Sequence, residues 1–428
     1  MTSVFQSLHV RNYRLFASGQ VVSLTGTWMQ RVAQDWLVLE LSHNSGTAIG
    51  ITTGLQFAPV LLVGLYGGVI ADRYDKRRVL VMTQVAMGLF ALALGLLDLS
   101  GMATLWHVYA LAFGLGIASA IDAPVRQAFV TELVGPSLLA NAVGLNSATF
   151  NTARVLGPAV AGLLIASSGT AWVFLINASS FLAVIACLLA MRDGELFTGK
   201  KAARRKGAVR EGLAYVRSRP ELVAITSLVA VVGTLGFNFQ LTSALLTKET
   251  FHHGAGSYGL ISAVYAFGAL LGALVAARRG ASMRRRLVFF AAGAYGVIEI
   301  LAGLMPTFWT FFALLIPFGF ATLTFSTAAN TTVQLAAAPN MRGRVMALYL
   351  IVFLGGTPIG SPFIGWVAEE FGPRWSLVTG GVASATAALL AALYLARRES
   401  LKVEPHLLRR HPHVHVKAIP QSEDAVVG

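Results

Sequence analysis

The chain has 428 residues, of which 55% are hydrophobic and only 12% are charged, and its formal net charge is +14. A soluble domain carries about 25% charged residues on average, so the polar residues here cannot cover one or two water-soluble domains and most of the chain must lie in lipid. The single Cys187 excludes an intramolecular disulfide framework.

Twelve apolar segments are long enough to cross a bilayer as helices. About 20 residues, each adding about 1.5 Å, span a hydrocarbon core of about 30 Å. No cleavable signal peptide is expected, because the first segment is too long for the apolar region of one. The predicted spans are residues 13–39, 47–71, 79–99, 105–126, 142–167, 171–191, 221–247, 257–277, 287–305, 308–330, 344–368 and 375–396.

The basic residues predict the orientation of these spans. With the N-terminus in the cytoplasm, only Lys248 and Arg374 fall on the outer side, while Arg31 and Arg154 fall within spans. Basic loops stay in the cytoplasm, so we expect a multi-pass protein of the cell membrane with both termini cytoplasmic. Anionic membrane lipid, rather than nucleic acid, is then the expected partner of the positive charge.

A long polar stretch divides the spans six and six. We therefore expect an N-terminal bundle (1–191), a basic cytoplasmic linker (192–220), a C-terminal bundle (221–396) and a disordered cytoplasmic tail (397–428). A faint repeat supports two halves, since the chain reads GPAVAG around Pro158 and GSPFIG around Pro362. Such repeats are typical of transporters with a site at the midplane.

The loop after the second span reads GVIADRYDKRR from Gly68 to Arg78. It resembles the signature loop of the major facilitator superfamily, GxxxDRxGRR, with Asp75 where that signature has its second glycine. The resemblance is fairly specific because the loop is short and follows span two of twelve. The counterpart in the second half, which begins at Gly272, has Ala276 at the aspartate position.

Longer stretches resemble one branch of that superfamily, the transmembrane secretion effector or enterobactin exporter-like group. They are FASGQVVSLTGTWMQRVAQDWLVLEL at 16–41, DAPVRQAFVTELV at 122–134 and NAVGLNSATFNTARVLGPAVAG at 141–162. The resemblance implies an all-α membrane fold of twelve helices in two pseudo-symmetric six-helix bundles. It also implies a cavity lined by spans 1, 4, 7 and 10, and export by alternating access that is usually driven by protons.

Charged residues near the signature loop predict a gate on the cytoplasmic side. An acid close to a helix N-terminus stabilises it by about 0.3–1 kcal/mol, and the resemblance assigns span eleven as the partner of Asp72. An arginine of the loop could bond Asp122, although Asp122 and Arg126 are i,i+4 neighbours that can pair with each other. The alternative is that these bases only orient the helices. The expected gate, which would hold the outward-facing state, consists of Gly68, Asp72, Arg73, Arg77, Arg78, Asp122 and Arg126.

Polar side chains recur on one face of spans one, seven and ten. Polar groups at this depth avoid lipid, so we expect these faces to line a substrate cavity; hydrogen bonding between helices is the alternative. Arg154, deep in span five, should pair with an acid or bind an anionic substrate. The predicted cavity residues are Gln20, Thr27, Gln34, Arg154, Thr234, Asn238, Thr242, Thr322, Ser326 and Asn330.

Three residues are candidates for coupling to protons or another ion: Asp35, Arg31 and Glu299. Arg31 and Asp35 are i,i+4 neighbours, and a nearby cation favours the ionised carboxylate, so Asp35 would take up a proton only if this pair breaks. An interfacial ion pair beside Trp36 is the alternative. Glu299 lies in span nine, which the family fold places at the periphery, so there a structural role is favoured.

Glycine and proline residues mark the expected hinges, Gly157-Pro158 in span five and Gly360 with Pro362 in span eleven. Proline removes a helix hydrogen bond and glycine allows close helix approach, although static kinks explain the same pattern. A set of aromatic residues is more typical of packing or lipid contact than of a cavity wall. They are Phe237, Phe239, Tyr265, Phe267, Tyr349 and Phe353.

No enzymatic or cofactor motif is found. A phosphate-loop-like stretch from Gly194 has Lys201 where magnesium-binding Ser or Thr would stand, so ATP is not expected as a partner. Neither a metal motif nor a nucleophile motif is present. We predict a secondary transporter, an antiporter that exchanges protons for small amphipathic or hydrophobic compounds such as drugs or siderophore-like metabolites. A lipid or lysolipid flippase, an uptake symporter, and a non-transporting sensor or enzyme partner are the alternatives.

Overall fold

The computed structural model describes residues 5–197, 208–279, 285–339, 341–398, 401–406 and 413–418. Part of the predicted linker, 198–207, lies outside these residues. The side chains of 64–69 and of 71–72 also lie outside the described part, and they include Gly68 and Asp72 of the expected gate.

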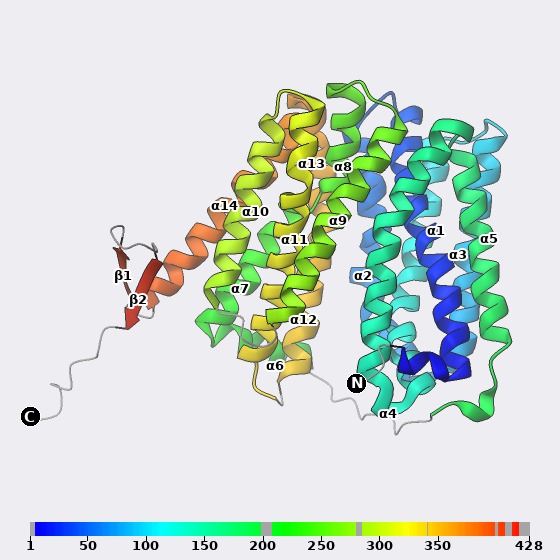
Figure 1. Cartoon of the computed structure of the whole chain (residues 1–428), viewed down its shortest axis with the longest axis horizontal. Helices are drawn as coiled ribbons and strands as arrows, with labels where there is room; N and C mark the ends of the chain where they lie inside the picture. Colours follow the sequence, from blue (N-terminus) through cyan, green and yellow to red (C-terminus); the bar gives the residue numbers. More distant parts are fainter. Residues whose placement is uncertain are drawn as a thin grey trace, which may run out of the picture.

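The first bundle follows a short 3-10 helix, η1 (Gln6–His9), and contains helices α1 to α5 (Figure 1). Each apolar segment is helical because only a helix satisfies its own backbone hydrogen bonds in lipid. Ser45 and Asp75 cap two of them by accepting bonds from Ala48 and Arg78 backbone amides. The helices are α1 (Arg11–Leu41), α2 (Gly46–Arg73), α3 (Lys76–Leu99), α4 (Leu105–Ser168) and α5 (Thr170–Leu189).

Helix α4 contains two of the predicted spans. At 64 residues it is too long for one crossing, and its backbone leaves the helical region at Gly135, with φ 68° and ψ 177°. A positive φ suits glycine, and the following Pro136 restarts a helix with a favourable φ. Spans four and five are therefore joined by a single reversal, which Phe197 covers through a backbone bond to Glu132.

The second bundle contains helices α7 to α14, after the short elements η2 (Asp193–Glu195) and α6 (Ala208–Arg217). Two of its crossings are interrupted: one consists of α7, η3, α8 and η4, and the other of α12 and α13. The elements are α7 (Pro220–Val231), η3 (Val232–Gly236), α8 (Phe239–Leu245), η4 (Leu246–Thr250), α9 (Ala255–Arg279), α10 (Arg285–Leu304), α11 (Phe308–Ala336), α12 (Arg342–Gly355), α13 (Thr357–Phe371) and α14 (Pro373–Arg398).

The crossings agree with the predicted fold class. Ten helices of the described chain are long and apolar enough to span a membrane. The 64-residue α4 contains two crossings. Helix α1 is also long enough to cross, with 31 residues, but its polar face lowers its mean hydropathy. The described helices therefore correspond to the twelve predicted crossings. Large apolar side chains such as Trp106, Leu163 and Phe290 are 72–79% exposed, as lipid-facing residues are. The all-α fold of two bundles is confirmed.

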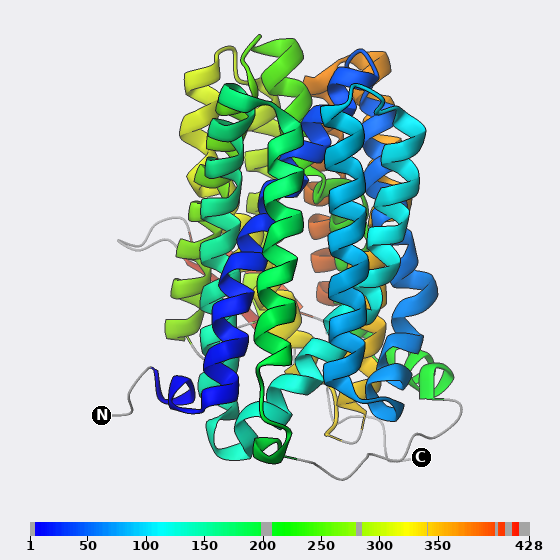
Figure 2. The ribbon, with the colours of Figure 1, turned by 90° about the vertical axis from the view of Figure 1, so that its right-hand side faces the viewer.

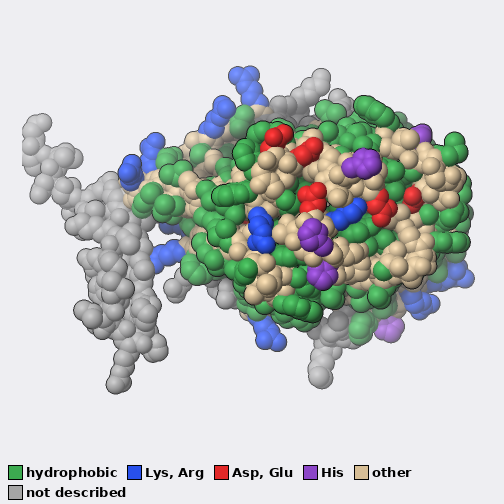
Figure 3. Space-filling model, turned by 90° about the horizontal axis from the view of Figure 1, so that it is seen from above, with side chains coloured by type: hydrophobic (Ala, Val, Ile, Leu, Met, Phe, Trp, Pro, Cys, Tyr) green, Lys and Arg blue, Asp and Glu red, His purple; other side chains and the backbone are tan. Residues whose placement is uncertain are grey.

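The two bundles touch at one end, which we call the upper end. It is the end where α1 stops and α2 begins (top in Figures 1 and 2). Here α2 packs on α13 and the second half of α4 packs on α9. Glycines allow the backbones to meet: a Cβ added at Gly50 would overlap Ser361, and one added at Gly259 would overlap Pro158. Viewed from above, acidic and histidine side chains gather over the middle of this face (Figure 3).

The expected hinge residues lie inside continuous helices. Helix α4 continues through Gly157-Pro158, and α13 continues through Gly360 and Pro362. The break in span eleven instead lies at Gly356, between α12 and α13. The expected hinge glycines are points of close approach, since a Cβ at Gly157 would overlap Trp28, at 2.5 Å, and one at Gly360 would overlap the backbone of Thr234.

Two short strands are described within the predicted tail (397–428), and residues 399–400, 407–412 and 419–428 lie outside the described part. Strands β1 (Leu401–His406) and β2 (His413–Ala418) pair antiparallel, with Leu401 opposite Ala418. Their side chains lie outside the described part.

Candidate functional site

A central cavity of about 300 Å³ lies between the bundles, within the range of small-molecule sites. Both bundles line it, and its walls combine aromatic rings with a few polar groups. The predicted residues that line it are Arg31, Gln34, Asp35, Arg154, Asn238, Thr322 and Ser326. Three of these residues lie on α1, where successive turns bring them to one side of the helix.

Five predicted cavity residues do not line this cavity. Thr27, Thr234 and Thr242 donate to carbonyls one turn earlier, of Ser23, Ala230 and Asn238. This local bonding satisfies a threonine hydroxyl inside its own helix, so the hydroxyl needs no cavity. Asn330 accepts a bond from Gln334, and Gln20 lies beside a second hollow of about 650 Å³ that Arg126 also lines.

Sequence reasoning missed several cavity residues. Gln56 accepts a bond of 3.3 Å from Gln34, and Trp28 and Phe57 form part of the wall. A sequence signal existed for Gln56 alone, because a glutamine in an apolar helix avoids lipid and marks an inner face. Of the aromatic set, Phe237, Phe239, Tyr265 and Phe353 line the cavity.

Arg31 and Arg154 share one aromatic ring in this cavity. The guanidinium carbon of Arg31 lies 4.8 Å from the Trp28 ring centre and that of Arg154 lies 5.6 Å from it. Arg31 also lies over Phe57, at 5.6 Å, and Arg154 over Tyr265, at 5.8 Å. Within the described residues neither guanidinium makes an ion pair, so the acid expected beside Arg154 is not found.

Asp35 is bonded to the other bundle rather than to Arg31. The hydroxyl of Tyr258, on α9, donates to its carboxylate at 2.7 Å. Both side chains are buried, with Asp35 7% and Tyr258 0% exposed. Trp36 stacks on Tyr258, and Lys248 lies 5.1 Å above the Trp36 ring. No ion pair joins Arg31 to Asp35 in the part of the chain that the structure describes, so the expected i,i+4 pair is replaced by a contact between bundles.

A second contact between the bundles lies at the upper surface. A carboxylate oxygen of Glu369, on α13, accepts from the Ser45 hydroxyl at 2.7 Å and from the Thr47 amide at 3.0 Å. The Glu369 carboxylate therefore sits at the N-terminus of α2, where the positive end of the helix favours an anion. Hydrogen bonds from backbone amides and hydroxyl groups stabilise the ionised form of a carboxylate in general, and so lower its pKa.

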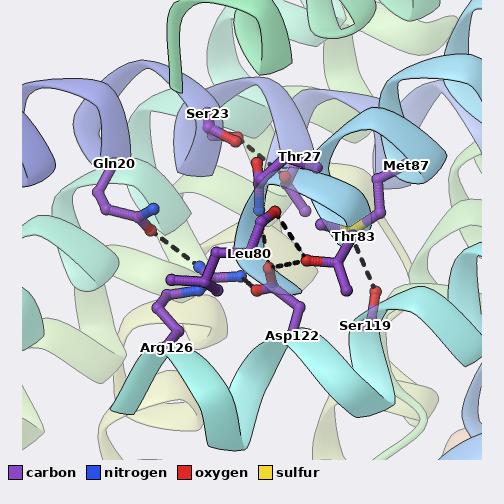
Figure 4. Close-up of polar contacts among 10 residues, drawn as sticks. Gln20, Ser23, Thr27, Leu80, Thr83, Met87, Ser119, Asp122 and Arg126 are labelled. Carbon is purple, nitrogen blue, oxygen red and sulfur yellow. Dashed lines mark hydrogen bonds and ion pairs between the residues drawn. The ribbon is translucent and has the colours of Figure 1, made fainter. Parts of the chain in front are cut away.

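Asp122 lies at the centre of a buried polar cluster near the lower end (Figure 4). It is 0% exposed, accepts from Thr83 at 2.8 Å and Gln84 at 2.9 Å, and pairs with Arg126. Arg126 also donates to Gln20, on α1, at 2.8 Å. The cluster therefore joins α1, α3 and α4 within the first bundle.

The loop arginines of the expected gate have other positions. Arg77 donates to the carbonyls of Leu188 and Leu189 at the end of α5, while Arg73 and Arg78 are exposed. Asp122 has its bonds from Arg126, Thr83 and Gln84 instead. The expected bond between a loop arginine and Asp122 is thus replaced by the i,i+4 pair.

Glu299 is buried inside the second bundle, away from the cavity. It is 2% exposed, and one carboxyl oxygen has no hydrogen-bond partner among the described residues. A Cβ added at Gly380, on α14, would lie 2.9 Å from its other oxygen. The neighbouring Tyr295 donates to the Gly236 carbonyl at 2.6 Å, where η3 ends.

Comparisons with known proteins agree with this architecture. The family model described as transmembrane secretion effector matches residues 2–427. The Staphyloferrin A transporter of Staphylococcus aureus is 27% identical over 91% of this chain and 98% of its own. The Enterobactin exporter EntS of Escherichia coli is 23% identical over 92% of this chain and 94% of its own.

Solved structures show the same fold. A bacterial homologue of the human lysosomal transporter Spinster, inward-facing and occupied, is similar with a TM-score of 0.71 and 19% identity over 90% of this chain and 97% of that one. The POT family transporter PepTSo is similar with a TM-score of 0.72 and 13% identity over 91% and 99%.

Proposed function

Because the chain belongs to the transmembrane secretion effector family of the major facilitator superfamily, we propose that it is a proton-coupled exporter of small amphipathic compounds, including siderophore-like metabolites and drugs. It is a multi-pass membrane transporter and not an enzyme. The cavity between the bundles supports this proposal most directly, since it combines polar and aromatic walls with a carboxylate that joins the two halves.

The distribution of basic residues supports the orientation. The lower end carries Arg73, Lys76 and Arg78, and the upper end carries few bases. The lower end therefore faces the cytoplasm of the plasma membrane, with both termini on that side. In this orientation the described state is closed toward the outside, and residues 1–191 and 221–396 are the two units that rock.

Asp35 is the proposed coupling residue. Its hydrogen bond with Tyr258 joins the bundles on the outer side of the cavity. Hydrogen bonds to an ionised group are about twice as strong as neutral ones, so protonation of Asp35 weakens this contact and favours opening toward the outside. Release of the proton in the inward-facing state restores the contact. Arg31, 4 residues earlier on α1, favours the ionised form.

Transport assays in proteoliposomes test the proposal. The purified protein is reconstituted and offered a panel of anionic, neutral and cationic amphipathic dyes. Proton antiport requires accumulation in vesicles with an acidic lumen and none in Asp35→Asn vesicles. Accumulation with an alkaline lumen indicates symport, movement of a fluorescent lysolipid without a gradient indicates a flippase, and no flux of any compound indicates a non-transporting protein.

A further inference from the structure

We propose that the central cavity selects compounds with an oxyanion, a carboxylate or a phosphate, attached to a flat apolar body, and that Arg31 and Arg154 hold this oxyanion together. The inference rests on the proposed function and deepens it by naming the chemistry of the transported compound.

The two guanidinium groups have free hydrogen-bond donors. Each has five N–H donors in one plane, yet within the described residues neither Arg31 nor Arg154 donates a hydrogen bond or forms an ion pair. Their contacts are ring faces, at 4.8 Å and 5.6 Å from the centre of Trp28. Stacking uses the face of a guanidinium and leaves the N–H groups at its edge available.

The charge of the cavity wall also favours an anionic ligand. Among the described residues that line the cavity, the cations are Arg31 and Arg154, and the one carboxylate, Asp35, already accepts a bond from Tyr258. Cations buried at membrane depth are costly unless they are paired. An anionic ligand supplies the missing counter-charge, whereas a cationic ligand would be repelled by both arginines.

The geometry suits an oxyanion that can accept two hydrogen bonds at once. Both guanidinium carbons lie within 5.6 Å of the Trp28 ring centre and both side chains line the same cavity, so we place the bound oxyanion beside this ring. Arginine binds carboxylate and phosphate through two parallel hydrogen bonds. Next to Arg154, whose guanidinium carbon lies 5.8 Å from the Tyr265 ring centre, Phe239 stacks on Tyr265 with ring centres 3.8 Å apart. Phe237 lies 5.7 Å from Phe353 in the same cavity. These rings offer an apolar surface to the rest of the ligand.

A charge series of one ring system tests the inference without any mutation. Binding to the full-length protein in lipid nanodiscs is measured by calorimetry for naphthalene-2-carboxylate, 2-naphthyl phosphate, naphthalene-2-carboxamide and 2-naphthylmethylammonium. We expect at least one of the two anions to bind about tenfold or more tightly than the carboxamide, and the ammonium to bind least. The ranking of the two anions identifies which oxyanion the site prefers.

Variants then assign the binding to the two arginines. Arg31→Gln and Arg154→Gln should each weaken anion binding about tenfold and leave the carboxamide unchanged, while the lysine variants retain part of the affinity. Arg217→Gln, an exposed arginine on α6, is the matched control and should bind as the wild type does. Thermal unfolding and gel filtration confirm that each variant is folded.

Equal binding of anion and carboxamide, no binding of any probe, or normal anion binding in both glutamine variants overturns the inference. The outcome is separable from the proposed function. Proton-driven flux of neutral dyes with no preference for anions leaves the export proposal standing and rejects the oxyanion site. Anion binding through the two arginines with no flux in proteoliposomes supports the oxyanion site and rejects the export proposal.

Discussion

The hydroxyl of Tyr258 lies 2.7 Å from a carboxylate oxygen of Asp35, and this bond joins α9 of one bundle to α1 of the other. It lies at the edge of the central cavity, because Asp35 also lines that cavity. A titratable group in such a position can link ligand access to the contact between the bundles.

Loss of the Asp35 charge should uncouple transport from the proton gradient. In Asp35→Asn the carboxamide keeps the size of the side chain and can still accept from Tyr258, but it cannot take up a proton. We expect proton-driven accumulation to be lost while exchange of labelled for unlabelled compound continues. Both are measured in proteoliposomes, and full accumulation by Asp35→Asn would remove this residue from the coupling mechanism.

Removal of the Tyr258 hydroxyl should favour the outward-open state. A hydrogen bond to a charged group contributes about 1.5–3 kcal/mol, so Tyr258→Phe should shift the balance of states about tenfold or more. The readout is labelling of a Thr53→Cys reporter in the cavity wall by an impermeant maleimide, in a Cys187→Ser background. Tyr109→Phe is the control, since that hydroxyl makes no hydrogen bond among the described residues. Equal labelling of both variants would contradict the prediction.

Larger side chains at the upper contact between the bundles should also favour the outward-open state, as Tyr258→Phe should. Gly50→Ala and Gly259→Ala each place a Cβ into the backbone of the opposite bundle, at Ser361 and Pro158. Overpacking of this kind costs about 1–3 kcal/mol, and only the closed upper end pays it. Maleimide labelling of the same reporter should therefore rise. Gly144→Ala, which meets no atom within 4 Å, should label like the parent.

The buried Asp122–Arg126 pair should matter for stability more than a surface pair. Arg126→Gln leaves the fully buried Asp122 without a cation, at a cost of about 3–5 kcal/mol. Asp122→Asn in the same chain should restore part of that loss, which a double-mutant cycle of detergent unfolding measures. Lys76→Gln breaks the partly exposed pair with Glu132, 2.5 Å apart, and should cost about 0–1 kcal/mol. Additive losses in the double variant would show that Asp122 and Arg126 do not interact.

Glu299 should prove to be structural. It lies outside the cavity lining, and among the described residues no basic side chain pairs with it. Glu299→Gln preserves its shape and hydrogen-bonding capacity, so proton-driven flux should stay within about twofold of wild type, because a buried polar group mainly requires its hydrogen bonds. A flux below this range, with normal folding, would assign proton coupling to Glu299.

Hydropathy and charge predicted the fold because lipid leaves few alternatives for an apolar chain. The span boundaries were less accurate where helices are broken. Span four extends beyond residue 126 to the reversal at Gly135, and span seven contains π-helical turns at Val232–Gly236 and Leu246–Thr250. The glycines in VGTLG were a local signal for the first of these turns.

The cavity could be predicted only in part. A step of four residues turns about 40° beyond a full helical turn. The side chains of Thr234, Asn238 and Thr242 therefore point in progressively different directions and do not all face the cavity. The π-helical turn between them shifts the register further. The Asp35–Tyr258 bond joins residues 223 positions apart, and a helical periodicity carries no information on such a contact.

Spans four and five are joined directly by the reversal at Gly135, so we expect them to move together. Arg126 lies in the polar cluster before the turn, and Arg154 lies in the cavity after it. Because only the turn at Gly135 separates the two spans, we expect a tilt of the second span on ligand binding at Arg154 to displace the polar cluster around Arg126 as well.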